Sequence, residues 1–174
     1  GIAFDIDGKT FTSSLSGMFN MYNILGAIAV GLSQHIQLEK IATAIAHFSG
    51  VPGRMEILQR RPFRVVVDYA HTPESLRSVY ETLRRPDVRM ICVFGACGGG
   101  RDTWKRPEFG KIAAEFCTET IITNEDPYDE DPVEILNEIE KGIPTSYKLP
   151  ATSFRKILDR RVAIAAALQS ARAG

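Results

Sequence analysis

The 174-residue sequence has few cysteines, no excess of either charge and no long apolar run. Three cysteines are an odd and sparse set, which argues against a disulfide framework and favours a reducing compartment. Lys plus Arg and Asp plus Glu number 21 each, so the chain lacks the basic balance typical of nucleic-acid binders. No apolar run reaches the roughly 20 residues of a membrane span, and no signal peptide is visible. These absences predict a cytoplasmic globular protein that binds neither nucleic acid nor membrane.

The first fifty residues predict a hairpin followed by two helices. Residues 2–15 are extended, and Asp7-Gly8 favours a tight turn there because both residue types tolerate positive φ. Apolar residues then recur at helical spacing over about 20–36 and over 38–48. The breaker Val51-Pro52-Gly53 ends this pattern. We therefore expect two domains, at residues 1–57 and 58–174.

Strands and helices alternate in the second part of the chain. Apolar strands are predicted over 63–69, 88–94 and 120–123, each followed by a helix. Thr72-Pro73 and Asp131-Pro132 have the residue types that begin helices, and a last helix is expected from about residue 160. Repeated strand–helix units predict an α/β fold with a Rossmann-like parallel sheet and helices on both of its faces.

A polar or glycine-rich loop follows each predicted strand: residues 68–73, the glycine loop (95–102) and the acidic loop (124–131). In open parallel sheets, ligands bind beyond the carboxyl ends of the strands. We therefore predict that the three loops surround one shared pocket. The alternative for the acidic loop is a solvated segment that only caps the following helix.

The glycine loop has the glycine spacing of a phosphate-binding P-loop without its chemistry. Arg101-Asp102 stand where Lys and Ser or Thr are needed, and the G-x-G-x-x-G pattern is absent. Two interpretations stay open. The glycines let the backbone approach a ligand anion, with Arg101 as a forked donor, or they form a tight turn that packs a strand on a helix.

The histidines and cysteines are weaker indications of a functional site than the three loops. Asp68 and His71 are placed to orient a ribose or a phosphate, although a histidine in a turn is often structural. His35 and His47 lie on predicted helices, and we interpret both as structural. Cys97 lies in the glycine loop without an evident base, and the three cysteines lack zinc-ligand spacing, so we expect no metal site in this chain.

Several motifs carry a family resemblance, and they occur in the expected order. They are Phe19-Asn-Met-Tyr-Asn23, Val51-Pro-Gly-Arg-Met-Glu56, Val67-Asp-Tyr-Ala-His-Thr-Pro73, Val93-Phe-Gly-Ala-Cys-Gly-Gly-Gly-Arg-Asp102, Lys105-Arg-Pro107 and Thr123-Asn-Glu-Asp-Pro127. The sequence resembles the Mur ligases, in particular those that add the third amino acid to UDP-N-acetylmuramoyl-dipeptide in peptidoglycan precursor synthesis. The resemblance implies that residues 1–57 end a central ATPase domain and that residues 58–174 form the C-terminal ligase domain, incomplete at its end.

The resemblance implies an ATP- and Mg²⁺-dependent ligase that forms an acyl phosphate, which an incoming amine then attacks. His71 is the candidate catalytic residue. Contacts to the nucleotide are implied for Asn23, Arg54, Asp68 and His71. Contacts to the incoming amino acid are implied for Arg101, Glu125, Asp126, Pro127 and Tyr128.

Two departures from the family pattern change these expectations. The family's P-loop, carbamylated lysine and Mg²⁺ ligands all precede the matching segments, so we expect this chain to be a fragment without ligase activity of its own. Diaminopimelate-adding members carry Asp-Asn-Pro-Arg where this chain reads Glu125-Asp-Pro-Tyr128. The arginine that holds the distal carboxylate is thus missing. We therefore expect lysine or another amino acid without a distal carboxylate, with diaminopimelate as the alternative.

Other classes share parts of the pattern. A folylpolyglutamate synthase-like ligase has the same architecture, although Tyr69-Ala-His-Thr-Pro73 fits the cell-wall ligases better. A non-catalytic, nucleotide-binding Rossmann-like module would bind its cofactor without an upstream P-loop domain. A scaffold domain that uses the acidic loop would keep its partner after substitution of Asp68 and Arg101.

Overall fold

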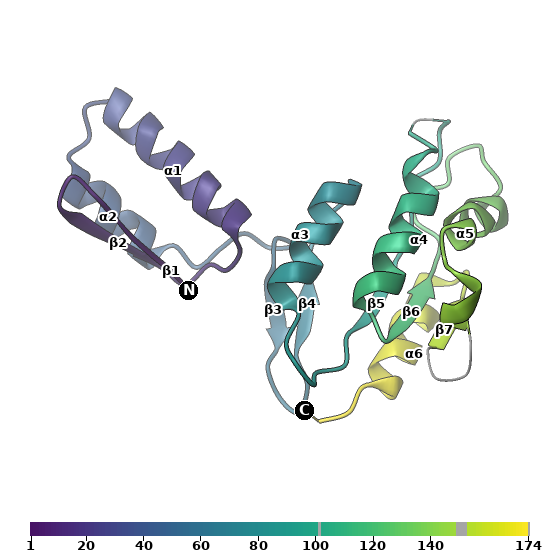
Figure 1. Cartoon of the computed structure of the whole chain (residues 1–174). Helices are drawn as coiled ribbons and strands as arrows, with labels where there is room; N and C mark the ends of the chain where they lie inside the picture. The colour runs from purple at the N-terminus through teal and green to yellow at the C-terminus, as the bar shows by residue number, and fades with distance from the viewer. Residues whose placement is uncertain (101, 149–152, 174) are drawn as a thin grey trace. The chain divides into compact units, whose positions relative to one another are not determined.

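A computed structural model describes residues 1–100, 102–148 and 153–173 of the chain (Figure 1). The chain divides into two compact units, one made of residues 1–58 and 65–69 and the other of residues 59–64 and 70–174. Each unit buries its own set of apolar side chains. Within the described residues, no helix is both long enough and apolar enough to cross a membrane.

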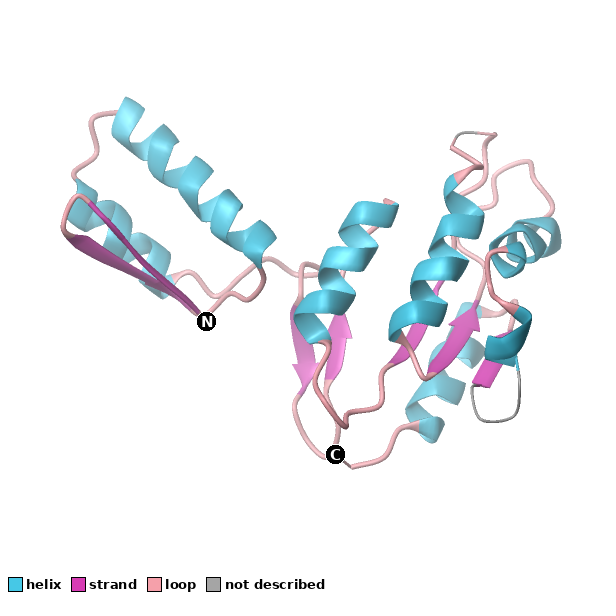
Figure 2. Cartoon of the chain, in the orientation of Figure 1, coloured by secondary structure: helices cyan, strands magenta, loops and turns pink. Residues whose placement is uncertain are grey.

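The first unit contains the predicted hairpin and both predicted helices (Figure 2). Strands β1 (Ile2–Ile6) and β2 (Lys9–Ser13) pair antiparallel. Asp7 and Gly8 form the turn with φ of 47° and 76°, as expected for this residue pair. Helices α1 (Met18–Ser33) and α2 (Leu38–His47) pack their apolar faces with the hairpin. The buried centre of the unit consists of Phe11, Ile24, Ile28, Ile41 and Ala42.

The strand expected over 63–69 differs from the prediction. Strand β4 (Val65–Val67) is shorter, is not fully buried, and pairs with β3 (Glu56–Gln59) in a separate two-stranded sheet. The side chain of Val67 is 40% exposed. An apolar run predicts a strand but not its partner, because pairing depends on contacts with residues elsewhere in the chain. The sequence did not predict β3.

The second unit is built on a parallel sheet of three strands in the order β5 (Ile91–Phe94), β6 (Glu119–Ile122), β7 (Ser153–Lys156). Strand β6 is central, and all four of its residues are buried. The sequence did not predict β7, since Phe154 is the only apolar residue among its four. The helices are α3 (Pro73–Leu83), α4 (Lys105–Phe116), α5 (Pro132–Lys141), the 3₁₀ turn η1 (Thr145–Lys148) and α6 (Arg160–Ser170).

Helices cover both faces of this sheet, as predicted. Side chains alternate along a strand, so Cys92 and Phe94 share one face of β5. On that face the ring of Phe94 meets Phe109 of α4 edge to face, with centroids 6.3 Å apart. Glu119 of β6 is in register with Ile91 and so points to the other face, where it bonds to Ser170 of α6. Helices α4 and α6 therefore lie on opposite faces, which is the Rossmann-like arrangement.

Glycines allow α4 and α5 to pack closely. A Cβ on Gly110 would lie 2.2 Å from the carbonyl oxygen of Ile139, and a Cβ on Gly142 would lie 1.7 Å from that of Pro107. Any larger side chain at these positions would push the helices apart. The first turns of α4 therefore lie against the carboxyl-terminal end of α5.

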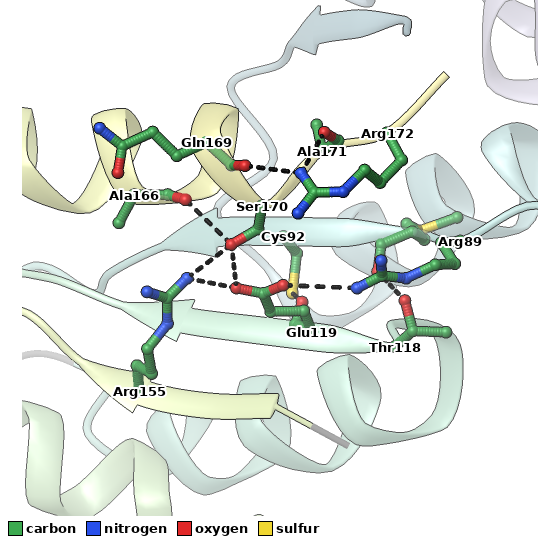
Figure 3. A network of polar contacts seen from close by, with 11 residues as sticks. Arg89, Cys92, Thr118, Glu119, Arg155, Ala166, Gln169, Ser170, Ala171 and Arg172 are labelled. Carbon is green, nitrogen blue, oxygen red and sulfur yellow. Dashed lines mark hydrogen bonds and ion pairs between the residues drawn. The ribbon is translucent and has the colours of Figure 1, made fainter. Parts of the chain in front are cut away.

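A buried carboxylate ties α6 and β7 to the amino end of β6 (Figure 3). Glu119 is only 3% exposed, and its carboxylate accepts hydrogen bonds from Arg155 of β7 and Ser170 of α6. Arg89 lies 3.6 Å from its second oxygen. Buried charges need such partners, because an unpaired carboxylate in a protein interior is costly. This network lies at the end of β6 opposite to the acidic loop and joins α6 and β7 to that strand.

Candidate functional site

The glycine loop and the acidic loop meet beyond the carboxyl ends of β5 and β6. The amide of Gly98 donates to the carbonyl oxygen of Asp126 at 2.8 Å. A Cβ on Gly95 would lie 2.3 Å from the carbonyl oxygen of Thr123, and one on Gly98 would lie 2.0 Å from that of Pro127. Only glycine permits backbones to approach so closely. The two loops therefore form one continuous surface at this edge of the sheet.

These contacts decide what the glycines do. Gly95 and Gly98 face the backbone of the acidic loop, and the amide of Gly100 donates to Glu130 Oε1 at 2.7 Å. The amides of Gly98 and Gly100 are thus engaged by the acidic loop and do not present themselves to a ligand anion. For these amides the contacts favour packing, although the packing joins two loops instead of a strand and a helix, and the role of Arg101 as a forked donor stays a prediction.

Arg106 lies at the buried centre of this arrangement, in the first turn of α4 and 2% exposed. Its Nη1 donates to Glu130 Oε2 and Glu138 Oε2, both at 2.8 Å. Its Nη2 donates to Glu130 Oε1 at 3.0 Å and to the carbonyl oxygen of Cys97 at 3.1 Å. One guanidinium therefore contacts the glycine loop, the acidic loop and α5, an arrangement that suits the planar fork of arginine.

The electrostatics of this cluster keep its two central groups charged. Hydrogen bonds from Arg106 and from the amides of Gly100 and Gly99 lower the pKa of Glu130 to about 2. Glu130 and Glu138 in turn raise the pKa of Arg106, against the effect of its burial. The pair is ionised at neutral pH, so its geometry does not depend on pH there.

The sequence did not identify Arg106, Glu130 or Glu138 as part of a site. One signal was present. Arg106 precedes Phe109 by three residues and Ala113 by seven, so it lies on the buried stripe of its helix. A charged residue on such a stripe requires partners from elsewhere in the fold.

The residues predicted to hold an amino acid lie partly at this surface. Pro127 contacts Gly98 through its backbone, and Asp126 and Tyr128 are exposed beside it. Tyr128 has a φ of 52°, and its ring would lie 3.5 Å from a Cβ on Gly99. Glu125 is half-buried, and Arg101 lies outside the described residues. Their binding role stays a prediction.

Three of the residues predicted to contact a nucleotide belong to the first unit. The carboxylate of Asp68 accepts a hydrogen bond from the amide of Met55 at 2.8 Å. The guanidinium of Arg54 lies 4.3 Å from the centroid of the Tyr69 ring. Asn23 is exposed on α1 and donates to Asn20 at 3.3 Å, so its amide lies on the helix surface. Asp68 and Arg54 are thus each held by a neighbour within the unit.

One premise of the pocket predicted for three loops, that all three loops follow strands of one sheet, is wrong, and the pocket itself stays a prediction. Two of the loops follow neighbouring strands of the three-stranded sheet, but residues 68–73 follow β4, which belongs to the two-stranded sheet. His71 is exposed and directly precedes Thr72, whose side chain accepts a hydrogen bond from Ser75 at 3.2 Å and caps α3. Among the described residues, no three His, Cys, Asp or Glu gather in a way that could hold a metal ion.

The family model "Mur ligase, glutamate ligase domain" matches residues 53–174. The chain belongs to the Mur ligase family. The UDP-N-acetylmuramoyl-L-alanyl-D-glutamate–2,6-diaminopimelate ligases of Gloeobacter violaceus and Bacillus velezensis are 46% and 39% identical to it. The alignments cover 94% and 95% of this chain and 33% of each relative. This Mur ligase chain therefore spans about a third of the length of the curated relatives it matches.

Solved structures agree with the fold of this Mur ligase chain. A UDP-N-acetylmuramoyl-L-alanyl-D-glutamate–2,6-diaminopimelate ligase superposes with a TM-score of 0.64 at 33% identity, covering 95% of this chain and 33% of the other. A folylpolyglutamate synthase of Mycobacterium tuberculosis superposes with a TM-score of 0.69 at 19% identity, covering 92% and 36%. At that identity the second likeness shows a common fold alone. The predicted Rossmann-like ligase fold is confirmed.

Proposed function

We propose that this chain is part of an ATP-dependent ligase that joins an amino acid to UDP-N-acetylmuramoyl-L-alanyl-D-glutamate. In the proposed reaction, ATP phosphorylates a carboxylate of the dipeptide, and the amine of the incoming amino acid attacks the acyl phosphate. An amide bond forms and inorganic phosphate leaves. The names of the relatives support the substrate, and the match over residues 53–174 supports the reaction class.

The observation that carries this proposal is the junction of the glycine loop and the acidic loop at the carboxyl end of the parallel sheet. Ligands of such sheets bind at that edge. Exposed Asp126 suits the ammonium of an amino acid, and Arg101 suits its carboxylate. We therefore propose that the described surface, together with Arg101, captures the incoming amino acid.

The proposed contacts to the nucleotide come from the other predicted residues. Asn23, Arg54, Asp68 and His71 are proposed to contact ATP, and His71 is the candidate catalytic residue. The sequence contains no Gly-x-x-x-x-Gly-Lys-Ser/Thr motif and the described residues offer no metal cluster. We propose that a phosphate-loop segment outside these 174 residues binds the phosphates of ATP and the Mg²⁺ ion. We therefore expect no ligation by the 174 residues alone.

Two observations point to different amino acids. The relatives named above are diaminopimelate ligases, which supports diaminopimelate as the substrate. Tyr128 replaces the arginine that would hold its distal carboxylate, which supports lysine. The deciding experiment gives the ligase that contains this chain ATP, UDP-N-acetylmuramoyl-L-alanyl-D-glutamate and either amino acid, and measures phosphate release and product mass. Release of phosphate that requires neither amino acid would contradict the proposed reaction.

Substitution of Tyr128 by arginine tests the specificity directly. A charge-assisted hydrogen bond contributes about 1.5–3 kcal/mol, so Tyr128→Arg should raise the preference for diaminopimelate over lysine by about 10- to 150-fold in kcat/KM. Tyr128→Phe is the matched control, because it keeps the ring and adds no charge. An unchanged preference in Tyr128→Arg would show that residue 128 does not face the side chain of the substrate.

A further inference from the structure

The motif Lys105-Arg-Pro107 has no role in the function proposed above, yet its arginine is buried beside the site. Arg106 is buried, and its four hydrogen bonds reach three separate segments: Cys97 of the glycine loop, Glu130 of the acidic loop and Glu138 of α5. The guanidinium is rigid and planar, so the positions of these partners are coupled to one another.

Glu130 is the link between the loops. Its Oε1 accepts from both Gly100 and Arg106, at 2.7 Å and 3.0 Å, and its Oε2 accepts from Arg106 at 2.8 Å. Gly100 has a φ of 69° and lies beside Gly99 with a φ of 82°, conformations that only glycine adopts readily. The amide of Gly100 is thus oriented by a carboxylate that Arg106 holds in place. Gly98 forms the second bond between the loops, through Asp126.

Glu138 differs from Glu130 in one respect that makes it a control. It accepts from the same nitrogen of Arg106 at the same distance, 2.8 Å, but it lies on α5 and forms no hydrogen bond to the described residues of either loop. Loss of Glu138 removes one partner of Arg106, and the two bonds to Glu130 and the bond to Cys97 remain. Loss of the Glu130 charge weakens the connection between the loops themselves.

We propose that Arg106 and Glu130 form a positioning pair that sets the spacing of the glycine loop and the acidic loop and thereby the affinity for the amino-acid substrate. This inference rests on the proposed function, since it assigns the amino acid to that surface. The proposed role involves no contact of either residue with the reacting atoms. The pair acts through Gly100, Cys97 and the backbone of the acidic loop. If these groups were displaced by about 1 Å, they would orient a ligand much less effectively.

The test compares Glu130→Gln with Glu138→Gln in the ligase that contains this chain. Glu130→Gln should raise the KM for the amino acid about tenfold or more, with the KM values for ATP and the UDP-linked dipeptide within about twofold of the wild type. Glu138→Gln should leave all three KM values within about twofold. Arg106→Lys keeps the charge but loses the fork, and it should resemble Glu130→Gln.

A second measurement reports on the contact between the loops and does not depend on ligase activity. Hydrogen exchange of the Gly100 amide in the 174-residue chain should be faster in Glu130→Gln than in the wild type, and unchanged in Glu138→Gln. Equal effects of the two substitutions on the KM for the amino acid, or on the exchange of Gly100, would overturn the inference and leave Arg106 a purely structural residue. A uniform rise of all three KM values in Glu130→Gln would overturn it as well.

The failure of the proposed function has a different signature. If the wild-type ligase joined neither lysine nor diaminopimelate to the dipeptide, the proposed function would fail, and the substrate part of this inference would fail with it. Faster exchange of Gly100 confined to Glu130→Gln would still support the coupling between the loops. Normal ligation with an unchanged KM in Glu130→Gln would overturn the positioning pair alone.

Discussion

Substitution of Gly98 by alanine tests whether close contact between the glycine loop and the acidic loop stabilises the second unit. Gly98 is buried, and the added Cβ would lie 2.0 Å from the carbonyl oxygen of Pro127, whereas ordinary contacts begin near 3.4 Å. The loops must therefore separate by more than about 1 Å, or the chain must distort nearby. The φ of Gly98 is not in the left-handed region, so the expected effect is steric.

The magnitude follows from two contributions. Overpacking of a close contact costs about 1–3 kcal/mol. The hydrogen bond from Gly98 to Asp126, now 2.8 Å, would stretch beyond bonding distance, which costs about 1 kcal/mol more. The free energy of unfolding should fall by about 2–4 kcal/mol, and at about 4 °C per kcal/mol the Tm should fall by roughly 8–16 °C.

The assay is thermal and urea unfolding of the 174-residue chain. Trp104 is the only tryptophan and belongs to the second unit, so its fluorescence follows the unit that carries Gly98. Gly26→Ala is the control, followed by far-UV circular dichroism. Gly26 lies inside α1 with no atom within 4 Å of an added Cβ, so alanine there should stabilise by about 0.5–1 kcal/mol. A Gly98→Ala chain as stable as the wild type would refute the reasoning about the loop contact.

Two further predictions concern buried and paired carboxylates. Glu119→Gln removes the charge that Arg155 and Arg89 contact, so it should lower the free energy of unfolding by about 1.5–3 kcal/mol. Ser170→Ala removes one hydrogen bond to Glu119 and should lower it by about 1 kcal/mol. Urea unfolding in which Ser170→Ala is the less stable of the two variants would contradict this. The pKa of Glu130 is lowered to about 2, so its contribution to stability is complete above its usual pKa and is lost as pH falls toward 2. The stability of Glu130→Gln should therefore depend less steeply on pH between about 5 and 2 than that of the wild type, and parallel pH profiles would contradict the pairing.

Local signals in the sequence were sufficient for most of the elements. Asp7-Gly8 predicted the hairpin turn, and Thr72-Pro73 and Asp131-Pro132 predicted the starts of α3 and α5. Each signal acts within a few residues, through backbone conformation or a cap, so no knowledge of the rest of the chain was needed. The ordered motifs likewise predicted the Mur ligase family, which the comparisons confirm.

Only the tertiary structure decided which strands pair and which charges are buried. The partner of β4 and the existence of β7 depend on segments far away in the chain. The apolar run of β4 and the single apolar residue of β7, Phe154, do not indicate which segments those are. Arg106 has the same limitation, because its partners Glu130 and Glu138 lie 24 and 32 residues further along the chain. Propensities and caps are properties of neighbouring residues, whereas pairing and charge burial arise when distant segments pack together. The sequence by itself therefore determined most of the elements and the family of this protein, and the packing of α4 against α5 and the acidic loop decided how its candidate site is held.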